Sequence, residues 1–76
     1  MEIGEKIHQY RRSKGLTQVE LANLAGVSKA AISRYESGDR EPSLKHLQAI
    51  GKAMGIKSIY LLPSWFINEV EENATP

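Results

Sequence analysis

Two glycine-ended helical segments, separated by a very short turn, constrain the fold of this chain more than any other feature. Thr17 and Glu20 lie three residues apart in the pattern of a capping box, which starts a helix. That helix ends at Gly26, because glycine readily takes a positive φ and turns the chain sharply. Ser28 is a candidate N-cap for the next helix, which Gly38 ends. About three residues therefore join two helices, which must cross steeply with little space between them.

The segments on either side of this pair also have helical patterns. Apolar side chains recur at spacings of four and three in the N-terminal segment, at Ile3, Ile7 and Tyr10, and Gly15 ends that helix. Ser43 is a candidate cap for a later helix that Gly55 closes. The apolar stripe of this later helix consists of Leu44, Leu47, Ile50 and Met54.

The C-terminal part of the chain predicts shorter helical segments. Ser58 is a candidate cap for a short fifth helix that Pro63 interrupts, and the apolar residues of 65–70 allow a sixth segment. No strand pattern or repeat is found. We therefore predict an all-α fold, with a compact five-helix domain over residues 1–62. Residues 63–76 are predicted to be a C-terminal extension with a short helix and a disordered end.

Size and composition restrict the chemistry of the chain. A domain of 76 residues buries only about 60% of its unfolded surface, so no large catalytic cleft is expected. The chain has no cysteine, which excludes disulfides and thiolate metal sites and fits a reducing compartment. His8 and His46 have no partners at metal-ligand spacing. We expect no metal, cofactor or enzymatic activity, and we expect no membrane span or signal peptide.

The charge of the chain is unevenly distributed along its length. The formal net charge is only +1, but every Lys and Arg lies at or before Lys57. Three glutamates, Glu69, Glu71 and Glu72, lie in the tail. Residues 1–68 therefore carry ten basic and six acidic side chains, a net charge of +4. This segregation allows a polyanionic partner, although most charged stretches are only solvated surfaces.

The helix that begins after Ser28 has little apolar surface to bury. Only Ile32 and Tyr35 are large, and their spacing places both on the inner side. The outer side is then formed by Lys29, Ala30, Ser33 and Arg34. Lysine and arginine donate to guanine O6 and N7, alanine contacts the thymine methyl, and serine donates or accepts. A slim, basic face of this kind is suited to entering the major groove of DNA.

The stretch TQVELANLAGVSKAAISRYESGDREP resembles the helix-turn-helix of the phage repressor and Cro type, also called the XRE family. The resemblance covers residues 3–62, and several positions agree in spacing at once. It implies five helices, a homodimer, and insertion of the third helix into the major groove of a partly palindromic double-stranded DNA operator. The implied function is a sequence-specific transcriptional regulator of the repressor kind. Its implied location is the cytoplasm, on DNA, in a bacterium or as a phage-encoded protein.

The resemblance also implies roles for individual residues. Lys29, Ala30, Ser33 and Arg34 match the family's base-reading positions. Gln18 matches a residue that contacts a phosphate and can brace the recognition helix. Free backbone amides at helix starts can bind phosphate as well. The predicted phosphate contacts are Thr17, Gln18, Ser28, Ser37, Arg40, Ser43 and Lys45.

Arg11 and Glu36 match a pair that joins the first helix to the end of the recognition helix in relatives. We interpret this pair as structural, because it would orient the recognition helix without touching bases. Tyr35 is interpreted as a core residue, because its spacing from Ile32 places both side chains on the inner side of the helix.

Homodimer formation is predicted to use the C-terminal side of the domain, because the second and third helices must remain free for DNA. The predicted dimerisation residues are Ile56, Ile59, Tyr60, Leu61, Trp65 and Phe66. A small domain seldom leaves large apolar side chains exposed together, so some surface must cover Trp65 and Phe66. Two alternatives remain for this tail, which either packs on its own domain or forms a seam between two copies.

A protein-interaction module, such as an antitoxin or anti-repressor, is the alternative function, since fold does not determine function. The outer face of the third helix lacks the aromatic or large aliphatic anchors that protein-binding surfaces usually have. Such anchors are present in the tail, around Trp65 and Phe66. A protein partner held by the C-terminal segment is therefore compatible with DNA binding by the third helix.

Overall fold

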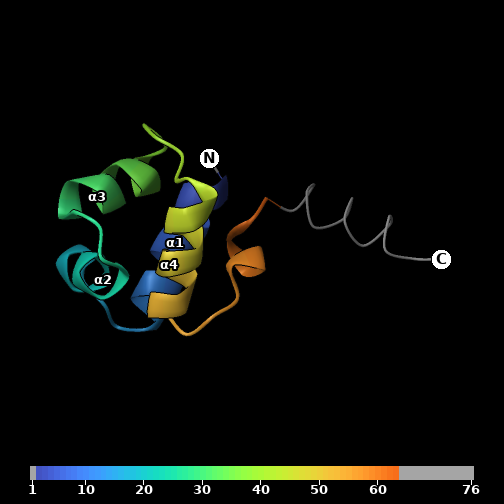
Figure 1. The fold of residues 1–76 in the computed structure, drawn as a ribbon. Coiled ribbons are helices and arrows are strands. Elements are labelled where there is room, and N and C mark those ends of the chain that lie inside the picture. Colours follow the sequence, from blue (N-terminus) through green and yellow to red (C-terminus); the bar gives the residue numbers. More distant parts are fainter. Residues whose placement is uncertain (1, 64–76) are drawn as a thin grey trace.

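The computed structural model describes residues 2–63 and contains only helices and connecting turns in that range. The elements are α1 (Glu2–Ser13), α2 (Gln18–Ala25), α3 (Lys29–Ser37), α4 (Leu44–Ala53) and the short 3-10 helix η1 (Ser58–Leu61). α1 and α4 form the centre of the molecule, with α2 and α3 on one side and η1 on the other (Figure 1). The predicted all-α fold is confirmed, with a 3-10 turn in place of the fifth α-helix.

The start of α2 has the geometry that the sequence predicts. The Thr17 hydroxyl accepts from the backbone amide of Glu20 at 3.1 Å, and the Glu20 carboxylate accepts from the Thr17 amide at 2.8 Å. This reciprocal capping box satisfies two backbone donors that the helix itself cannot pair. Gly26 ends α2 with a φ of 71°. Its positive φ turns the chain so that α3 begins three residues later.

Serine side chains cap α3 and α4 as predicted. The Ser28 hydroxyl accepts from the amide of Ala31 at 3.0 Å, and the Ser43 hydroxyl accepts from the amide of His46 at 3.2 Å. The prediction that Ser58 caps the fifth helix is wrong, because Ser58 lies inside η1 and Lys57 precedes it without a side-chain cap. η1 ends within one turn, where Pro63 has no amide hydrogen to extend it.

One apolar core joins all five elements. Its buried members are Ile7, Leu21, Ala22, Ile32, Tyr35, Leu47, Ile50, Met54 and Leu61. Leu61 is fully buried, so its assignment to a dimerisation surface is wrong: the 3-10 turn directs this side chain inward, where it closes the core beside α1 and α4. Leu44 is 67% exposed because it is the first residue of α4, so the stripe of this helix begins one turn later at Leu47.

Gly4 determines how closely α1 approaches the recognition helix α3. A β-carbon at this position would overlap the carbonyl oxygen of Tyr35 and lie 2.9 Å from that of Glu36. Only glycine therefore allows the backbone of α1 to pass directly over the C-terminal turn of α3. This contact, which we did not predict from the sequence, sets the position of α3 in the fold.

The remaining sequence predictions for the tail, including a sixth helical segment and the roles of Trp65 and Phe66, lie outside the described residues. Within residues 2–63, no helix combines the length and apolar character needed to cross a membrane.

Candidate nucleic-acid interface

The recognition helix α3 turns its two large apolar side chains inward. Ile32 is fully buried and Tyr35 is 3% exposed, so both belong to the core. Lys29, Ala30 and Arg34 are exposed and Ser33 is partly buried on the other side of the helix. The structure thus brings the four predicted base-reading residues together on the outer face of α3. This face carries two cations and two small side chains.

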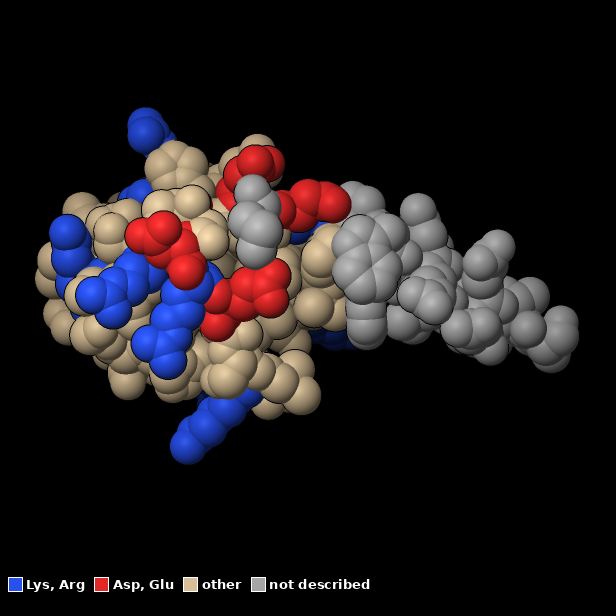
Figure 2. Space-filling model, turned by 90° about the horizontal axis from the view of Figure 1, so that it is seen from above, with Lys and Arg blue, Asp and Glu red and all other residues tan. Residues whose placement is uncertain are grey.

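Basic side chains gather at the same end of the molecule. Figure 2 shows several Lys and Arg side chains over the α2 and α3 end, at the left of the view, with acidic side chains nearer the centre. The exposed basic residues of α3, of the turn that follows and of the start of α4 include Lys29, Arg34, Arg40 and Lys45. The distribution favours an anionic partner on this end of the molecule.

The residues predicted to contact phosphate lie on the surface, except for Gln18, which is partly buried. The exposed members are Thr17, Ser28, Ser37, Arg40, Ser43 and Lys45. Three of their hydroxyls already accept hydrogen bonds as helix caps. The Ser37 hydroxyl donates to the carbonyl of Arg34 at 3.1 Å and accepts from the amide of Asp39 at 3.3 Å. The four hydroxyl side chains of this set are therefore held in place by local hydrogen bonds.

A hollow of about 490 Å³ lies between the end of α1 and the starts of α2 and α3. Arg12, Gln18 and Lys29 line it, together with residues of the turn that contains Gly15. Its two exposed cations and the N-terminal end of α2 make this hollow chemically suited to an anion.

The carboxylate of Glu36 collects hydrogen bonds from two other helices. The Arg11 Nε donates to Glu36 Oε2 at 2.6 Å, and Arg11 Nη2 donates to Oε1 at 3.0 Å. His8 Nδ1 lies 2.9 Å from Oε1, and Gln18 Nε2 donates to the same oxygen at 3.2 Å. The Arg11 guanidinium also donates to the carbonyl of Leu16 at 2.8 Å. We call Glu36 and its partners Arg11, His8 and Gln18 the Glu36 cluster.

Glu36 and Arg11, at the centre of the Glu36 cluster, are shielded from solvent, which strengthens the interaction between them, whereas the His8 side chain is 45% exposed. The side chains of Glu36 and Arg11 are only 6% and 11% exposed. Burial by itself would raise the pKa of Glu36, but hydrogen bonds from Arg11, His8 and Gln18 outweigh it and hold the pKa below its ordinary value. The hydrogen bond between Arg11 and Glu36 also stabilises the charged guanidinium, so it raises the pKa of Arg11. An ionised carboxylate thus ties α1 and α2 to the last turn of α3.

Sequence reasoning found the Arg11 and Glu36 pair, and the structure places the two in direct contact. It also anticipated that Gln18 could brace the recognition helix, and the Gln18 amide reaches Glu36. His8 was missed as a member. The available signal was its position three residues before Arg11, which places both side chains on one face of α1.

A second link joins α3 to α4. The Tyr35 hydroxyl lies 2.8 Å from His46 Nδ1, so the hydroxyl of this core residue has an internal partner. Among the described residues, no group of three or more His, Cys, Asp or Glu side chains is arranged to hold a metal ion. The arrangement as a whole is a basic helix face whose helix is joined by hydrogen bonds to α1, α2 and α4.

Comparison with known proteins gives this geometry a family context. A family profile described as helix-turn-helix matches residues 7–61. The HTH-type transcriptional activator BcrR of Enterococcus faecalis is 43% identical over 56 residues, which are 74% of this chain and 28% of that protein. The chain spans only part of the length of its curated relatives. In three relatives that match over 56 to 60 residues, the matched segment makes up 28%, 56% and 38% of the relative's own length.

Solved structures agree in the arrangement of the whole domain. The DNA-binding domain of the c2 repressor of Salmonella phage P22 superposes with a TM-score of 0.79 and 34% identity, over 84% of each chain. SinR of Bacillus subtilis, a master regulator for biofilm formation solved in complex with DNA, gives a TM-score of 0.77 and 35% identity. That match covers 80% of this chain and 98% of the SinR chain. The chain therefore belongs to the helix-turn-helix family of DNA-binding regulators of the phage-repressor, or XRE, type.

Proposed function

We propose that the chain is a sequence-specific regulator of transcription, acting as a repressor, that reads a partly palindromic DNA operator as a homodimer. The observation that carries the proposal is the outer face of α3, where Lys29, Ala30, Ser33 and Arg34 lie together, opposite the buried side chains of Ile32 and Tyr35. Similarity to the P22 c2 repressor domain and to SinR in complex with DNA supports it.

The dimensions of α3 suit the major groove. The groove is about 12 Å wide, and an α-helix with its side chains is about 10 to 12 Å across. Ala30 and Ser33 keep the outer face slim, so the helix can approach the base edges closely. Lys29 and Arg34 then donate to guanine O6 and N7, while Ala30 contacts a thymine methyl group. These four residues select the sequence.

Phosphate contacts near both ends of α3 hold the domain in register. Arg40 and Lys45 are exposed and follow the C-terminal end of α3, and the hollow lined by Arg12, Gln18 and Lys29 lies at its N-terminal end. The amide groups at the starts of α2 and α4 add dipoles that favour a phosphate near Thr17 and Ser43. Such contacts supply most of the salt-dependent affinity without selecting a base.

The Glu36 cluster prepares α3 for binding. Because one buried carboxylate joins α1, α2 and the last turn of α3, the recognition helix needs little rearrangement when DNA arrives. In this proposal Arg11, His8 and Glu36 act structurally. Gln18 has both roles, since it braces Glu36 and lies at the edge of the hollow.

Dimerisation follows from the small size of one recognition helix, which covers too few base pairs for strong specific binding at physiological salt. Two copies with α3 helices about 34 Å apart would occupy successive turns of one DNA face. Ile59 and Tyr60 are 38% and 53% exposed on η1 and are available for an isologous interface. Ile56 is partly buried against the core, and Trp65 and Phe66 lie outside the described residues.

Selection of bound duplexes from a random pool tests the proposal. We expect enrichment of one half-site repeated with two-fold symmetry about one helical turn apart, and sedimentation should show two chains per duplex. Enrichment of single half-sites would reject the homodimer and leave sequence-specific binding intact. Recovery of the unselected pool would favour the protein-interaction alternative, such as an antitoxin or anti-repressor.

Replacing Arg34 by alanine is expected to weaken binding to the selected operator by about 1 to 3 kcal/mol. The reason is the loss of a bidentate contact to one guanine, so discrimination at one base position should also relax. Titration of the selected duplex and of single-base variants measures both effects. Lys52→Ala is the matched control, because Lys52 is an exposed cation at the far end of α4. An equal loss on every sequence would make Arg34 a phosphate contact.

A further inference from the structure

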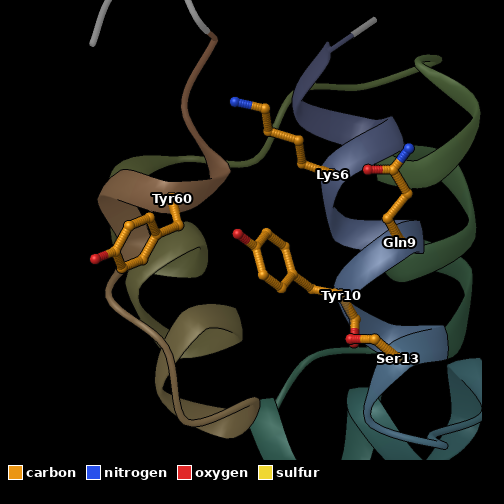
Figure 3. Close-up of a pocket in the computed structure, with 5 residues that line it drawn as sticks. All are labelled: Lys6, Gln9, Tyr10, Ser13 and Tyr60. Carbon is orange, nitrogen blue, oxygen red and sulfur yellow. The ribbon is translucent and has the colours of Figure 1, made fainter.

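A groove between α1 and η1 is separate from the proposed DNA-binding face. Its volume is about 360 Å³, and it is lined by Lys6, Gln9, Tyr10, Ser13 and Tyr60. In Figure 3 the ring of Tyr10 points from α1 toward η1, where Tyr60 stands, while Lys6, Gln9 and Ser13 lie along α1. Figure 1 places η1 on the side of α1 and α4 opposite to α2 and α3. An occupant of this groove would therefore leave the recognition helix free.

The groove has the composition of a site for an aromatic group. Tyr60 is 53% exposed, and Ile59 beside it is 38% exposed. Two tyrosine rings and the aliphatic stem of Lys6 supply apolar surface, while Gln9 and Ser13 supply polar groups at its edge. The volume is at the low end of the range for pockets that take small organic groups, which is enough for an aromatic side chain.

The C-terminal end of η1, from which the tail continues, is held beside this groove. Lys6 is one of the residues that line the groove, and its Nζ donates to the carbonyl of Leu62 at 2.7 Å. This hydrogen bond fixes the end of η1 next to α1, and Pro63 follows immediately. Trp65 lies three residues after Leu62, and at about 3.3 to 3.6 Å per residue its backbone can be no farther than roughly 11 Å from the anchored carbonyl. The first aromatic residues of the tail are therefore tethered within reach of the groove.

We propose that the groove between α1 and η1 is the docking site of the chain's own Trp65 and Phe66. The indole ring packs against Tyr10 and Tyr60, where offset or edge-to-face contacts between aromatic rings are favourable. Its N–H finds acceptors in the hydroxyl and amide groups at the edge of the groove. Docking covers apolar side chains that a small domain would otherwise leave exposed.

The tether favours the chain's own tail over that of a second copy. A segment joined by so short a linker meets its own groove at an effective concentration in the millimolar range, provided the linker can span the distance. A second copy at micromolar concentration competes poorly against it. Docking within one chain covers Tyr60, so of the two exposed side chains of η1 only Ile59 remains for pairing between copies. The inference does not depend on DNA binding or on homodimer formation.

Trp65 is the only tryptophan of the chain, so its fluorescence reports directly on the site. In the full chain without DNA, we expect a blue-shifted emission maximum and low quenching by acrylamide, both independent of protein concentration. Tyr60→Ala removes one wall of the groove and should move the emission toward that of free indole and raise the quenching constant several-fold. Val19→Ala, on α2, is the control, because Val19 is also about half exposed. Far-UV circular dichroism verifies the fold of each variant.

Nuclear Overhauser contacts of the indole protons give a second readout that needs no substitution. Contacts to the rings of Tyr10 and Tyr60 within one labelled chain support the proposal. Contacts only between differently labelled copies, or protection of Trp65 that disappears on dilution, would assign the groove to a second copy and overturn it. A solvent-exposed Trp65, or protection unchanged in a folded Tyr60→Ala variant, would also overturn it.

Discussion

Replacement of Glu36 by alanine is expected to lower the free energy of unfolding by about 3 to 5 kcal/mol. The variant leaves the Arg11 guanidinium, whose side chain is only 11% exposed, without its carboxylate partner. A buried charge without a partner costs far more than the pair contributes in net stability. His8 and Gln18 lose the same acceptor. Chemical denaturation near neutral pH measures the change, and Glu41→Ala is the control, because Glu41 is exposed.

The pH dependence of the stability of the unmodified protein and of Glu36→Ala gives an independent check. The folded state holds the pKa of Glu36 below its ordinary value of 4.5, so the carboxylate contributes stability above that pH. This contribution is lost as the pH falls through the lowered folded-state pKa. The difference in stability between the unmodified protein and Glu36→Ala should therefore shrink in acid. An unchanged melting temperature of Glu36→Ala near neutral pH would contradict a buried ion pair between Arg11 and Glu36.

Local features of this fold could be predicted from the sequence because short-range chemistry decides them. The Thr17 and Glu20 capping box needs only two side chains and the adjacent amides, and the structure has both of its hydrogen bonds. Gly26 ends α2 for an equally local reason, its positive φ. The inward position of Ile32 follows from helical spacing on α3 alone. The composition of the outer face of α3 followed from the same spacing.

Features that depend on contacts between distant segments were harder to predict. Leu61 belongs to an apolar run, IYLL, whose exposed and buried members become distinct only when η1 packs on α1 and α4. His8 joins Glu36 across 28 residues, so nothing in its neighbourhood identifies the carboxylate as its partner. Gly4 does not lie in a turn that would require a glycine, and its role is visible only where α3 crosses α1. The base and phosphate contacts remain predictions, because they also require the DNA.

Replacement of Gly4 by alanine is expected to destabilise the domain by about 3 kcal/mol, at the upper end of the usual cost of overpacking. The new methyl group would overlap the carbonyl oxygen of Tyr35 and press against that of Glu36. Both obstacles are backbone atoms, so no side-chain rotation relieves the contact and α1 must move away from α3. Alanine favours a helix over glycine by about 1 kcal/mol, which reduces the loss without reversing it.

Gly15→Ala separates this steric effect from the general cost of replacing a glycine. Gly15 has a φ of 71° and open space around its α-carbon, so alanine there pays only for the left-handed conformation, about 1 to 2 kcal/mol. Thermal and chemical unfolding should rank Gly4→Ala as the less stable variant, although Gly4 lies in a helix and Gly15 in a turn. Because the displaced segment is the last turn of α3, Gly4→Ala should also weaken binding to the selected operator. Equal stability of the two variants would mean that α1 and α3 are not in close contact at Gly4, and the orientation of the recognition helix would then have to rest on the Glu36 cluster alone.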